Sequence, residues 1–246
     1  MLFTGFKLGE MPDATTLCRF RNKLIEKKKY KTILKKINQQ LKANNLQVEV
    51  AEAAILDTTL IESNTHPESV TEMPEDRNEN DVNDPGISQS KDPDAKWIKK
   101  GKKSSFGYKG FAVCDEEGYI METIVKPANV AECKELGNLI SDIKADRILA
   151  DKAYASKSNH ELLKSKGFKD GILHKASRVK KLKESQKKFN KLISKTRFKI
   201  EQCFGTLKRR FKFTKASYFT CVKVEAQFTF KAICMNINKA LNKIVG

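Results

Sequence analysis

The feature that most constrains the fold of this chain is a long segment of helical apolar periodicity in its last quarter. Between residues 189 and 211 apolar side chains recur every three or four positions, which predicts an amphipathic helix with one buried face. These side chains are Phe189, Leu192, Ile193, Ile200, Cys203, Phe204, Leu207 and Phe211. At about 100° per residue, Arg197, Glu201 and Lys208 share a strip beside the apolar one. The predicted helix therefore carries one carboxylate between two cations.

Two aspartates end apolar, strand-like runs elsewhere in the chain. Asp57 follows Ala-Ile-Leu, and Asp151 follows Ile-Leu-Ala. A carboxylate at the end of a buried strand is costly unless it is paired, hydrogen-bonded or bound to a metal. For Arg197 and Glu201 the alternative is an ordinary ion pair four residues apart on a solvated helix, worth about 0.3–0.5 kcal/mol. Because the three acids are far apart in sequence, only the fold can bring them together.

The spacing Arg197-x3-Glu201-x6-Lys208 resembles the signature helix of DDE transposases from bacterial insertion sequences, in the IS-five-like group. Asp57-Thr58-Thr59 and Asp151-Lys152-Ala153-Tyr154 resemble the first two acid motifs of that family. The resemblance also includes residues 12–21, 106–109 and 127–129, so it covers nearly the whole chain in the family's order. The chain departs from the family at Ser194, where a tyrosine is common. It also begins late relative to the family, so we expect it to be N-terminally shortened.

The resemblance implies a transposase that cleaves DNA at insertion-sequence ends and transfers the strands into target DNA. Asp57, Asp151 and Glu201 would be the catalytic acids and would hold two Mg²⁺ (or Mn²⁺) ions, with Asp57 bridging both. Arg197 and Lys208 would hold phosphates on either side of the scissile bond. Weaker candidates for DNA contact are Tyr154, Lys109, Arg19 and Arg21. A homodimer on DNA is expected, because two ends are cut together.

Two other functions remain open at this point. The chain could be a catalytically inactive DNA-binding remnant of a transposase, since an N-terminal truncation would prevent pairing of the ends. It could also be a nuclease of the same fold that lacks strand transfer. Nicking of a terminal-repeat fragment separates the remnant from the two enzymes.

The order of predicted elements indicates an α/β fold. A strand at 53–60 is followed by a hairpin at 106–113 and 119–125, a helix at 132–143 and a strand at 147–150. A helix at 159–166, a short strand at 171–174, the glutamate helix and a helix at 222–244 complete the chain. This order predicts a mixed sheet flanked by helices and resembles the ribonuclease H-like fold. We assign residues 48–246 to this catalytic domain.

Residues 62–104 form a polar insert in the predicted catalytic domain. Between residues 62 and 94 there are ten acidic and two basic side chains, and the insert contains four prolines. This composition predicts a disordered or loosely held loop. The insert closes with Trp97 among lysines, and an aromatic ring in such a setting either stacks on an unpaired base or covers the edge of the core.

Residues 1–47 are predicted to form a small helical, basic region, a partial DNA-binding domain. Two helices are expected between residues 13 and 44, with Asp13 as the N-cap of the first. Arg19, Arg21 and many lysines lie on their polar faces. Such a face either docks on the DNA backbone or is simply solvated.

The formal net charge of +18 predicts an anionic partner, and DNA is the first candidate. The six cysteines contain no Cys-x-x-Cys pair, and the three histidines have no zinc-type spacing, so a zinc site is not expected. The sequence also lacks an apolar run long enough for a membrane span. We therefore expect a bacterial cytoplasmic protein associated with the nucleoid, with reduced cysteines.

Overall fold

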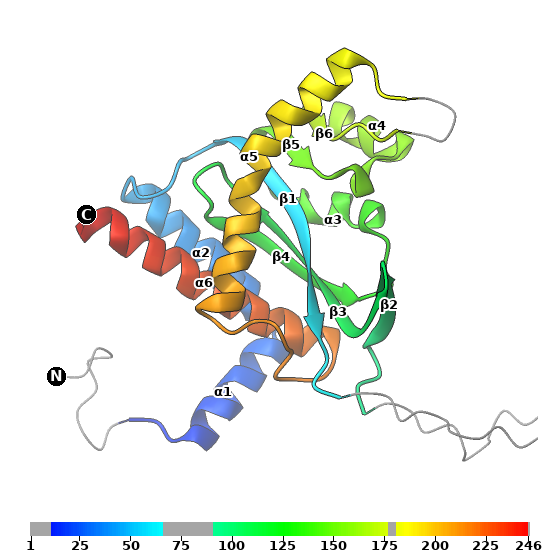
Figure 1. Ribbon diagram of the computed structural model, residues 1–246. Helices are drawn as coiled ribbons and strands as arrows, with labels where there is room; N and C mark the ends of the chain where they lie inside the picture. Colours follow the sequence, from blue (N-terminus) through cyan, green and yellow to red (C-terminus); the bar gives the residue numbers. More distant parts are fainter. Residues whose placement is uncertain (1–10, 66–90, 177–180, 246) are drawn as a thin grey trace, which may run out of the picture.

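The computed structural model describes residues 11–65, 91–176 and 181–245, which form a six-stranded mixed sheet with helices on both faces (Figure 1). The strands are β1 (Ala51–Glu62), β2 (Lys96–Lys100), β3 (Lys103–Cys114), β4 (Ile120–Pro127), β5 (Ala145–Ala150) and β6 (Lys169–Ile172). The α-helices are α1 (Ala14–Glu26), α2 (Lys29–Ala43), α3 (Leu136–Leu139), α4 (Lys157–Ser165), α5 (Glu184–Arg209) and α6 (Cys221–Val245). Two 3-10 turns, η1 (Glu132–Lys134) and η2 (Lys152–Tyr154), complete the set.

The sheet combines antiparallel and parallel pairing around β1. Strand β1 pairs antiparallel with β3 on one side and parallel with β5 on the other, and β5 pairs parallel with β6. Strand β3 is long, so its first half pairs with β2 and its second half with β4 on the same edge. The ribonuclease H-like arrangement expected from the sequence is confirmed.

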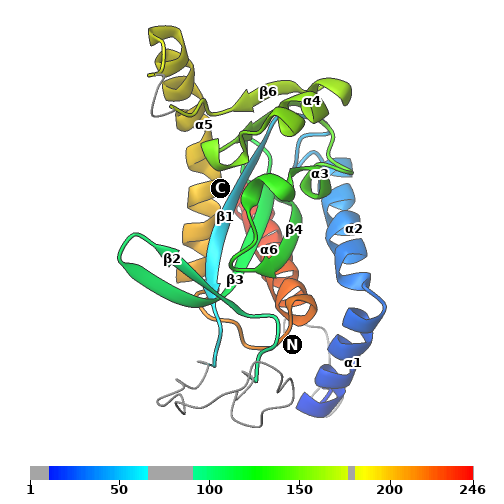
Figure 2. The same ribbon diagram turned by 90° about the vertical axis from the view of Figure 1, so that its right-hand side faces the viewer.

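The two faces of the sheet bury separate apolar cores. Ile55 and Ile61 of β1 pack with side chains of α5 and α6, whereas Ala54 and Leu56 pack with α3 and α4. Figure 2 shows α5 and α4 on opposite sides of the sheet. This follows from the alternation of side chains along a strand. Any polar side chain of β1 that shares the face of Ile55 is therefore directed toward α5.

Two elements differ from the sequence prediction. The helix expected at 132–143 is only the turn η1 followed by the short α3, since Gly137 and Asn138 are poor helix formers and no side chain caps α3. Strand β2 was not predicted, because its sequence of mostly lysines lies inside the expected insert. Residues 66–90 of that insert lie outside the described residues.

Leu192 was predicted to be buried but is 61% exposed. Its neighbours on the stripe, Phe189 and Ile193, do pack against the core, so Leu192 lies at the uncovered margin of the apolar face. Periodicity identifies the apolar face of a helix but not the width of that face that a partner covers. In the described part of the chain, no helix combines the length and apolar character needed to cross a membrane.

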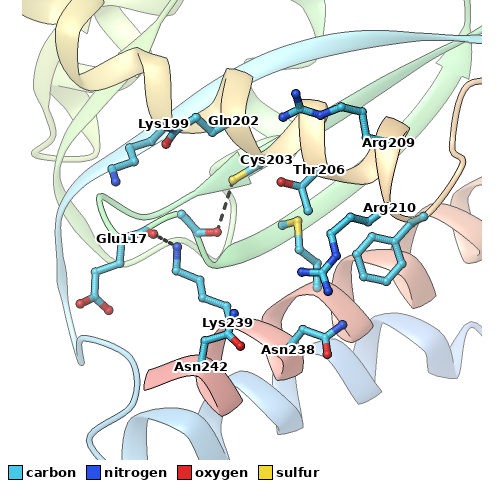
Figure 3. Close-up of a pocket in the computed structure, with 13 residues that line it drawn as sticks. Glu117, Lys199, Gln202, Cys203, Thr206, Arg209, Arg210, Asn238, Lys239 and Asn242 are labelled. Carbon is cyan, nitrogen blue, oxygen red and sulfur yellow. Dashed lines mark hydrogen bonds between the residues drawn. The ribbon is translucent and has the colours of Figure 1, made fainter. Parts of the chain in front are cut away.

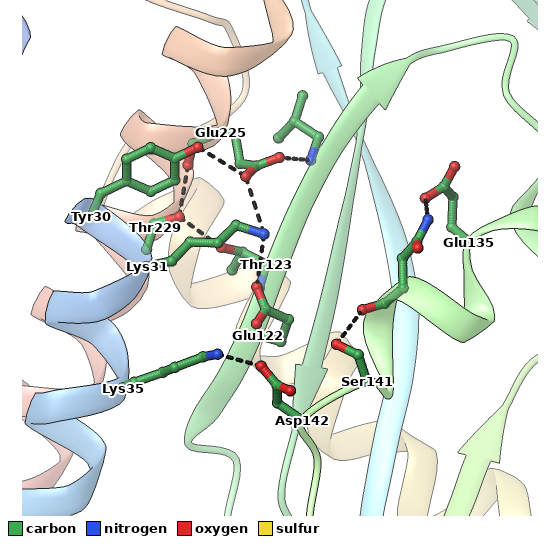
Figure 4. Close-up of polar contacts among 12 residues, drawn as sticks. Tyr30, Lys31, Lys35, Glu122, Thr123, Glu135, Ser141, Asp142, Glu225 and Thr229 are labelled. Atoms are coloured by element: carbon green, nitrogen blue, oxygen red, sulfur yellow. Dashed lines mark hydrogen bonds and ion pairs between the residues drawn. The ribbon is translucent and has the colours of Figure 1, made fainter. Parts of the chain in front are cut away.

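The N-terminal helices dock on the core through a buried polar network around Glu225 of α6 (Figure 4). Glu225 Oε1 accepts a hydrogen bond from the Tyr30 hydroxyl at 3.1 Å and lies 3.3 Å from Lys31 Nζ. Glu225 Oε2 accepts from the backbone amide of Val125 at 3.0 Å. Burial, with the Glu225 charge, raises the pKa of Tyr30. One carboxylate thus joins α2, β4 and α6.

We expect Glu225→Gln to lower the free energy of unfolding by about 1.5–3 kcal/mol, the usual worth of hydrogen bonds to a charged group. The amide cannot accept from all three donors and removes the charge that pairs with Lys31. Thermal melting checks this result. Lys157→Gln is the matched control because the Lys157–Glu161 pair is exposed, and its melting temperature should be unchanged. Equal melting of both variants would show that the network does not hold the N-terminal helices.

Candidate active site

Asp57 and Asp151 lie side by side because of the parallel pairing of β1 and β5. Ile55 is paired with Leu149, so each aspartate lies two residues further along its own strand direction. Side chains two residues apart on a strand share a face. Asp57 is within β1, and Asp151 directly follows β5. The register therefore brings both carboxylates to the face of the sheet covered by α5.

Arg197 of α5 lies between the two aspartates. Its Nη2 donates to Asp57 Oδ2 at 2.8 Å, and its Nη1 is 3.8 Å from Asp151 Oδ1. The Arg197 side chain is 9% exposed, and its Nε has no hydrogen-bond partner among the described residues. A single buried guanidinium thus contacts two carboxylates and balances only part of their charge.

The Asp57 carboxyl is in an environment that disfavours its charged form. Burial raises the pKa of Asp57, while Arg197 and the backbone amide of Thr58 oppose the shift. The neighbouring charges of Asp151 and Glu132 raise the pKa further. The net direction is upward, so Arg197 does not fully offset the effects of burial and of the neighbouring negative charges. An additional cation would stabilise the site.

Glu201 does not join the aspartates in this arrangement. It lies one turn beyond Arg197 on α5, and its side chain is exposed. The buried neighbours Ile200, Cys203 and Phe204 fix the rotation of the helix. Over the described ranges, no three His, Cys, Asp or Glu side chains are grouped closely enough to hold a metal ion. The fold therefore brings together two of the three predicted acids.

The other predicted DNA-binding cations lie apart from the aspartate pair. Lys208 is half-buried near Lys100; burial and that second lysine lower its pKa, against the influence of Glu62. Arg19 is exposed on α1. Arg21 donates to the Tyr218 hydroxyl at 2.6 Å, and its guanidinium lies 4.3 Å from the centre of that ring. Lys208 and Arg19 are thus accessible, whereas Arg21 is held against Tyr218.

Lys109 and Tyr154 were candidates for phosphate contact, but both are buried. Lys109 Nζ donates to the Val130 carbonyl at 2.8 Å and lies 3.6 Å from Glu132. Tyr154 is fully buried in the core beside α4, and its hydroxyl has no partner within the described part of the chain. Because helices cover both faces of the sheet, neither side chain presents a polar group to DNA in this structure.

Glu132 is a site residue that sequence reasoning missed. Its Oε1 accepts a hydrogen bond from Thr58 Oγ1 at 3.0 Å, next to Asp57 in β1. It also lies near Lys109. The available signal is its place three residues after the motif at 127–129, whereas the sequence prediction includes Glu132 in a longer helix. The carboxylate raises the negative charge around Asp57 and links β1 to β3 through side chains.

A separate basic pocket of about 350 Å³ lies between α5 and α6 (Figure 3). Its lining includes Lys199, Arg209, Arg210 and Lys239, whereas its carboxylate, Glu117, is paired with Lys243 at 3.0 Å. None of the predicted catalytic acids lines it. This pocket is on the opposite side of α5 from Arg197 and offers an additional positively charged surface.

Comparison with known proteins decides the family. Residues 49–237 match the family model of the transposase DDE domain, which is more than half of the chain. The chain belongs to the DDE transposase family. It is 40% identical over 228 residues to the transposase for insertion sequence element IS1106 of Neisseria meningitidis serogroup B, covering 92% of this chain and 78% of that relative. No solved structure matches the chain.

For a DDE transposase, DNA is the partner, and the family generally uses divalent metal ions. The residues present fit such an ion in donor type, since Asp57 and Asp151 supply the oxygen ligands that Mg²⁺ prefers. The negative charges of Asp151 and Glu132, which help to raise the pKa of Asp57, agree with a site that accepts a cation. The aspartate pair, rather than the basic pocket, is therefore the candidate active site of this transposase.

Proposed function

We propose that this transposase cleaves DNA at the ends of an insertion sequence and joins those ends to target DNA. The observation that supports this proposal is the placement of Asp57 and Asp151 on neighbouring strands around one buried cation. A pair of carboxylates from distant parts of the chain is costly for the fold. Binding of a catalytic metal ion would explain why the fold contains this unfavourable pair of carboxylates.

In this proposal Asp57, Asp151 and Glu201 hold two Mg²⁺ or Mn²⁺ ions. Such ions activate a water or a 3′-hydroxyl for attack and stabilise the charge on the leaving oxygen. Asp57 and Asp151 would hold the ions as oxygen ligands, and Glu201 is assigned as the third acid from the family motif. Before a metal ion binds, the positive charge of Arg197 partly balances the negative charges of Asp57 and Asp151.

Several cationic side chains are proposed to bind and orient DNA. Lys208 and Arg197 contact phosphates beside the scissile bond, and Arg19 and Arg21 of α1 contact the backbone outside the site. We propose that two copies act on DNA as a homodimer, so that two ends are processed together. Strand transfer then follows cleavage without a covalent link between protein and DNA.

A catalytically inactive DNA-binding protein is the second candidate. It is favoured by the exposure of Glu201 and by its separation from the aspartate pair among the residues described. This candidate keeps the positive charge and DNA binding but lacks the third ligand. The two functions differ in whether the protein nicks DNA when a divalent metal is supplied.

The deciding experiment is Mn²⁺-dependent nicking of a terminal-repeat fragment taken from DNA flanking the gene. We expect nicking by the wild type and a loss of at least about 100-fold in Asp151→Asn, since even changes behind a metal ligand cost about 10–100-fold. Asp146→Asn, an exposed carboxylate on the same strand, is the control and should nick normally. Joining to a target plasmid in the same reaction measures strand transfer.

Each outcome of this experiment supports a different function. Equal nicking by the wild type and Asp151→Asn would remove the proposed role of that aspartate. If the protein binds the fragment but does not nick it, the protein is a catalytically inactive DNA-binding protein. Nicking without joined product would indicate a nuclease instead.

A further inference from the structure

The hairpin formed by β2 and β3 carries the single tryptophan of the chain, Trp97. Trp97 is 52% exposed although tryptophan is the largest apolar side chain. One face of its ring contacts Phe106, with ring centroids 5.4 Å apart and the planes tilted by 52°. A large aromatic surface therefore remains open to solvent on an edge strand.

The hairpin is also strongly basic. The exposed lysines at its strands and tip are Lys96, Lys99, Lys100, Lys102 and Lys103. Lysines on an edge strand protect a sheet from pairing with other chains, and this effect alone could explain them. It does not explain an exposed tryptophan among them, because an apolar ring favours the association that the lysines prevent.

The base of the hairpin is fixed to the core. Asp92 is fully buried and accepts hydrogen bonds from Ser63 Oγ at 2.6 Å and from the Tyr108 hydroxyl. Asp94 accepts from the backbone amide of Cys221 at 2.7 Å. The hairpin projects from the sheet on the side where α5 lies (Figure 2). Trp97 is thus presented by a fixed support, which reduces the entropy lost on binding.

The hairpin lies on the same side of the sheet as the candidate active site (Figure 2). Phe106, the partner of Trp97, belongs to the apolar core on the α5 side of the sheet, which is also the side of Asp57. Lys100 is close enough to Lys208 of α5 to lower its pKa, after the larger effect of burial. Two lysines held near each other favour an anion between them. A strand of DNA leaving the aspartate pair along α5 would meet this surface.

We infer that the β2–β3 hairpin binds single-stranded DNA, with the Trp97 ring stacked on an unpaired base and the lysines on neighbouring phosphates. The inference rests on the proposed function only in taking DNA processed by this enzyme as the ligand. Stacking on an aromatic ring suits any base, but it requires a base whose face is exposed, which a duplex does not offer. The hairpin therefore distinguishes separated strands from duplex DNA.

Because Trp97 is the only tryptophan, fluorescence excited at a wavelength that tyrosine does not absorb reports on this ring alone. The full chain is titrated with a single strand of about 12 nucleotides, within the usual range of site sizes, and with the duplex of the same sequence. EDTA is present, so cleavage is not required. We expect saturable quenching by the single strand and little by the duplex. Equal quenching by both, or none by either, would overturn the inference.

Variants test whether the ring itself binds. By fluorescence anisotropy of labelled DNA, Trp97→Ala should bind the single strand about 5- to 150-fold more weakly, the range for one stacked base. Trp97→Phe keeps a stacking ring and should remain within about 3-fold of the wild type. Leu192→Ala, which removes an exposed apolar side chain elsewhere, should not change binding.

The outcomes separate this inference from the proposed catalysis. The quenching is measured in EDTA and needs no metal, so a failure of the wild type to nick DNA leaves the inference intact. Circular dichroism of Trp97→Ala checks folding, and Trp97→Phe remains informative if that variant is unstable. Unchanged single-strand binding by folded Trp97→Ala would show that the ring only covers the edge of the core.

Discussion

Replacing Arg197 by methionine is expected to lower the free energy of unfolding by about 3–5 kcal/mol, the usual cost of removing one partner of a buried ion pair. The change leaves the carboxylates of Asp57 and Asp151 facing each other without the guanidinium that both contact. Methionine keeps much of the apolar stem, so the loss is mainly electrostatic. At about 2–4 °C per kcal/mol for a chain of this size, the melting temperature falls by about 6–20 °C.

Lys208→Met is the control on the same helix. Its charged form is already disfavoured by burial and by Lys100, as its lowered pKa indicates, so removing the charge should not reduce stability. Mn²⁺ provides a second measurement, because a cation between the aspartates can replace the lost guanidinium. Mn²⁺ should raise the melting temperature of Arg197→Met more than that of the wild type. Wild-type melting of Arg197→Met in EDTA would contradict the ion-pair account.

Gly107→Ala is expected to destabilise the protein by about 3 kcal/mol or more, at the upper end for overpacking. A Cβ at this position would lie 2.2 Å from the Ile61 carbonyl oxygen and 2.7 Å from the Ser63 backbone nitrogen. Both obstacles are backbone atoms of β1 and the residues after it, so no side chain can move aside. At Gly107 the pairing of β3 with β2 ends and its pairing with β1 begins, and β4 pairs with β3 from the next residue. Denaturant unfolding measures the loss.

Gly137→Ala is the matched control for the glycine prediction. A Cβ there would meet its nearest atom, Leu162 Cδ2, at an ordinary 3.5 Å. Alanine in place of glycine in a helix usually adds about 0.5–1 kcal/mol, so α3 should be slightly stabilised. If Gly107→Ala unfolded at the same denaturant concentration as the wild type, β1 and β3 could not be as close as described.

The sequence predicted the order of most elements because their patterns are local. Asp13 accepts from the amide of Thr16 as an N-cap should, and the hairpin of β3 and β4 was expected at its observed place. Register between distant elements is not local. Periodicity placed Arg197 and Glu201 on one strip of α5, but it could not determine which of them would lie over the carboxylates of β1 and β5.

The burial of Lys109 could not be predicted from the alternation in β3. Helices cover both faces of this strand, so inward and outward positions are not distinguished by polarity. The lysine is tolerated because Val130 and Glu132 supply an acceptor and a counter-charge. Tyr154 was misplaced for a related reason, since the three-residue turn after Asp151 leaves Lys152 and Ala153 exposed but directs Tyr154 into the core.

The hydrogen bond between Ser63 and Asp92 joins the end of β1 to the approach of β2. Two side chains 29 positions apart in the sequence therefore meet at one end of the sheet. The placement of the β2–β3 hairpin relative to β1, the strand that carries Asp57, thus depends on this contact as well as on the pairing of β1 with β3.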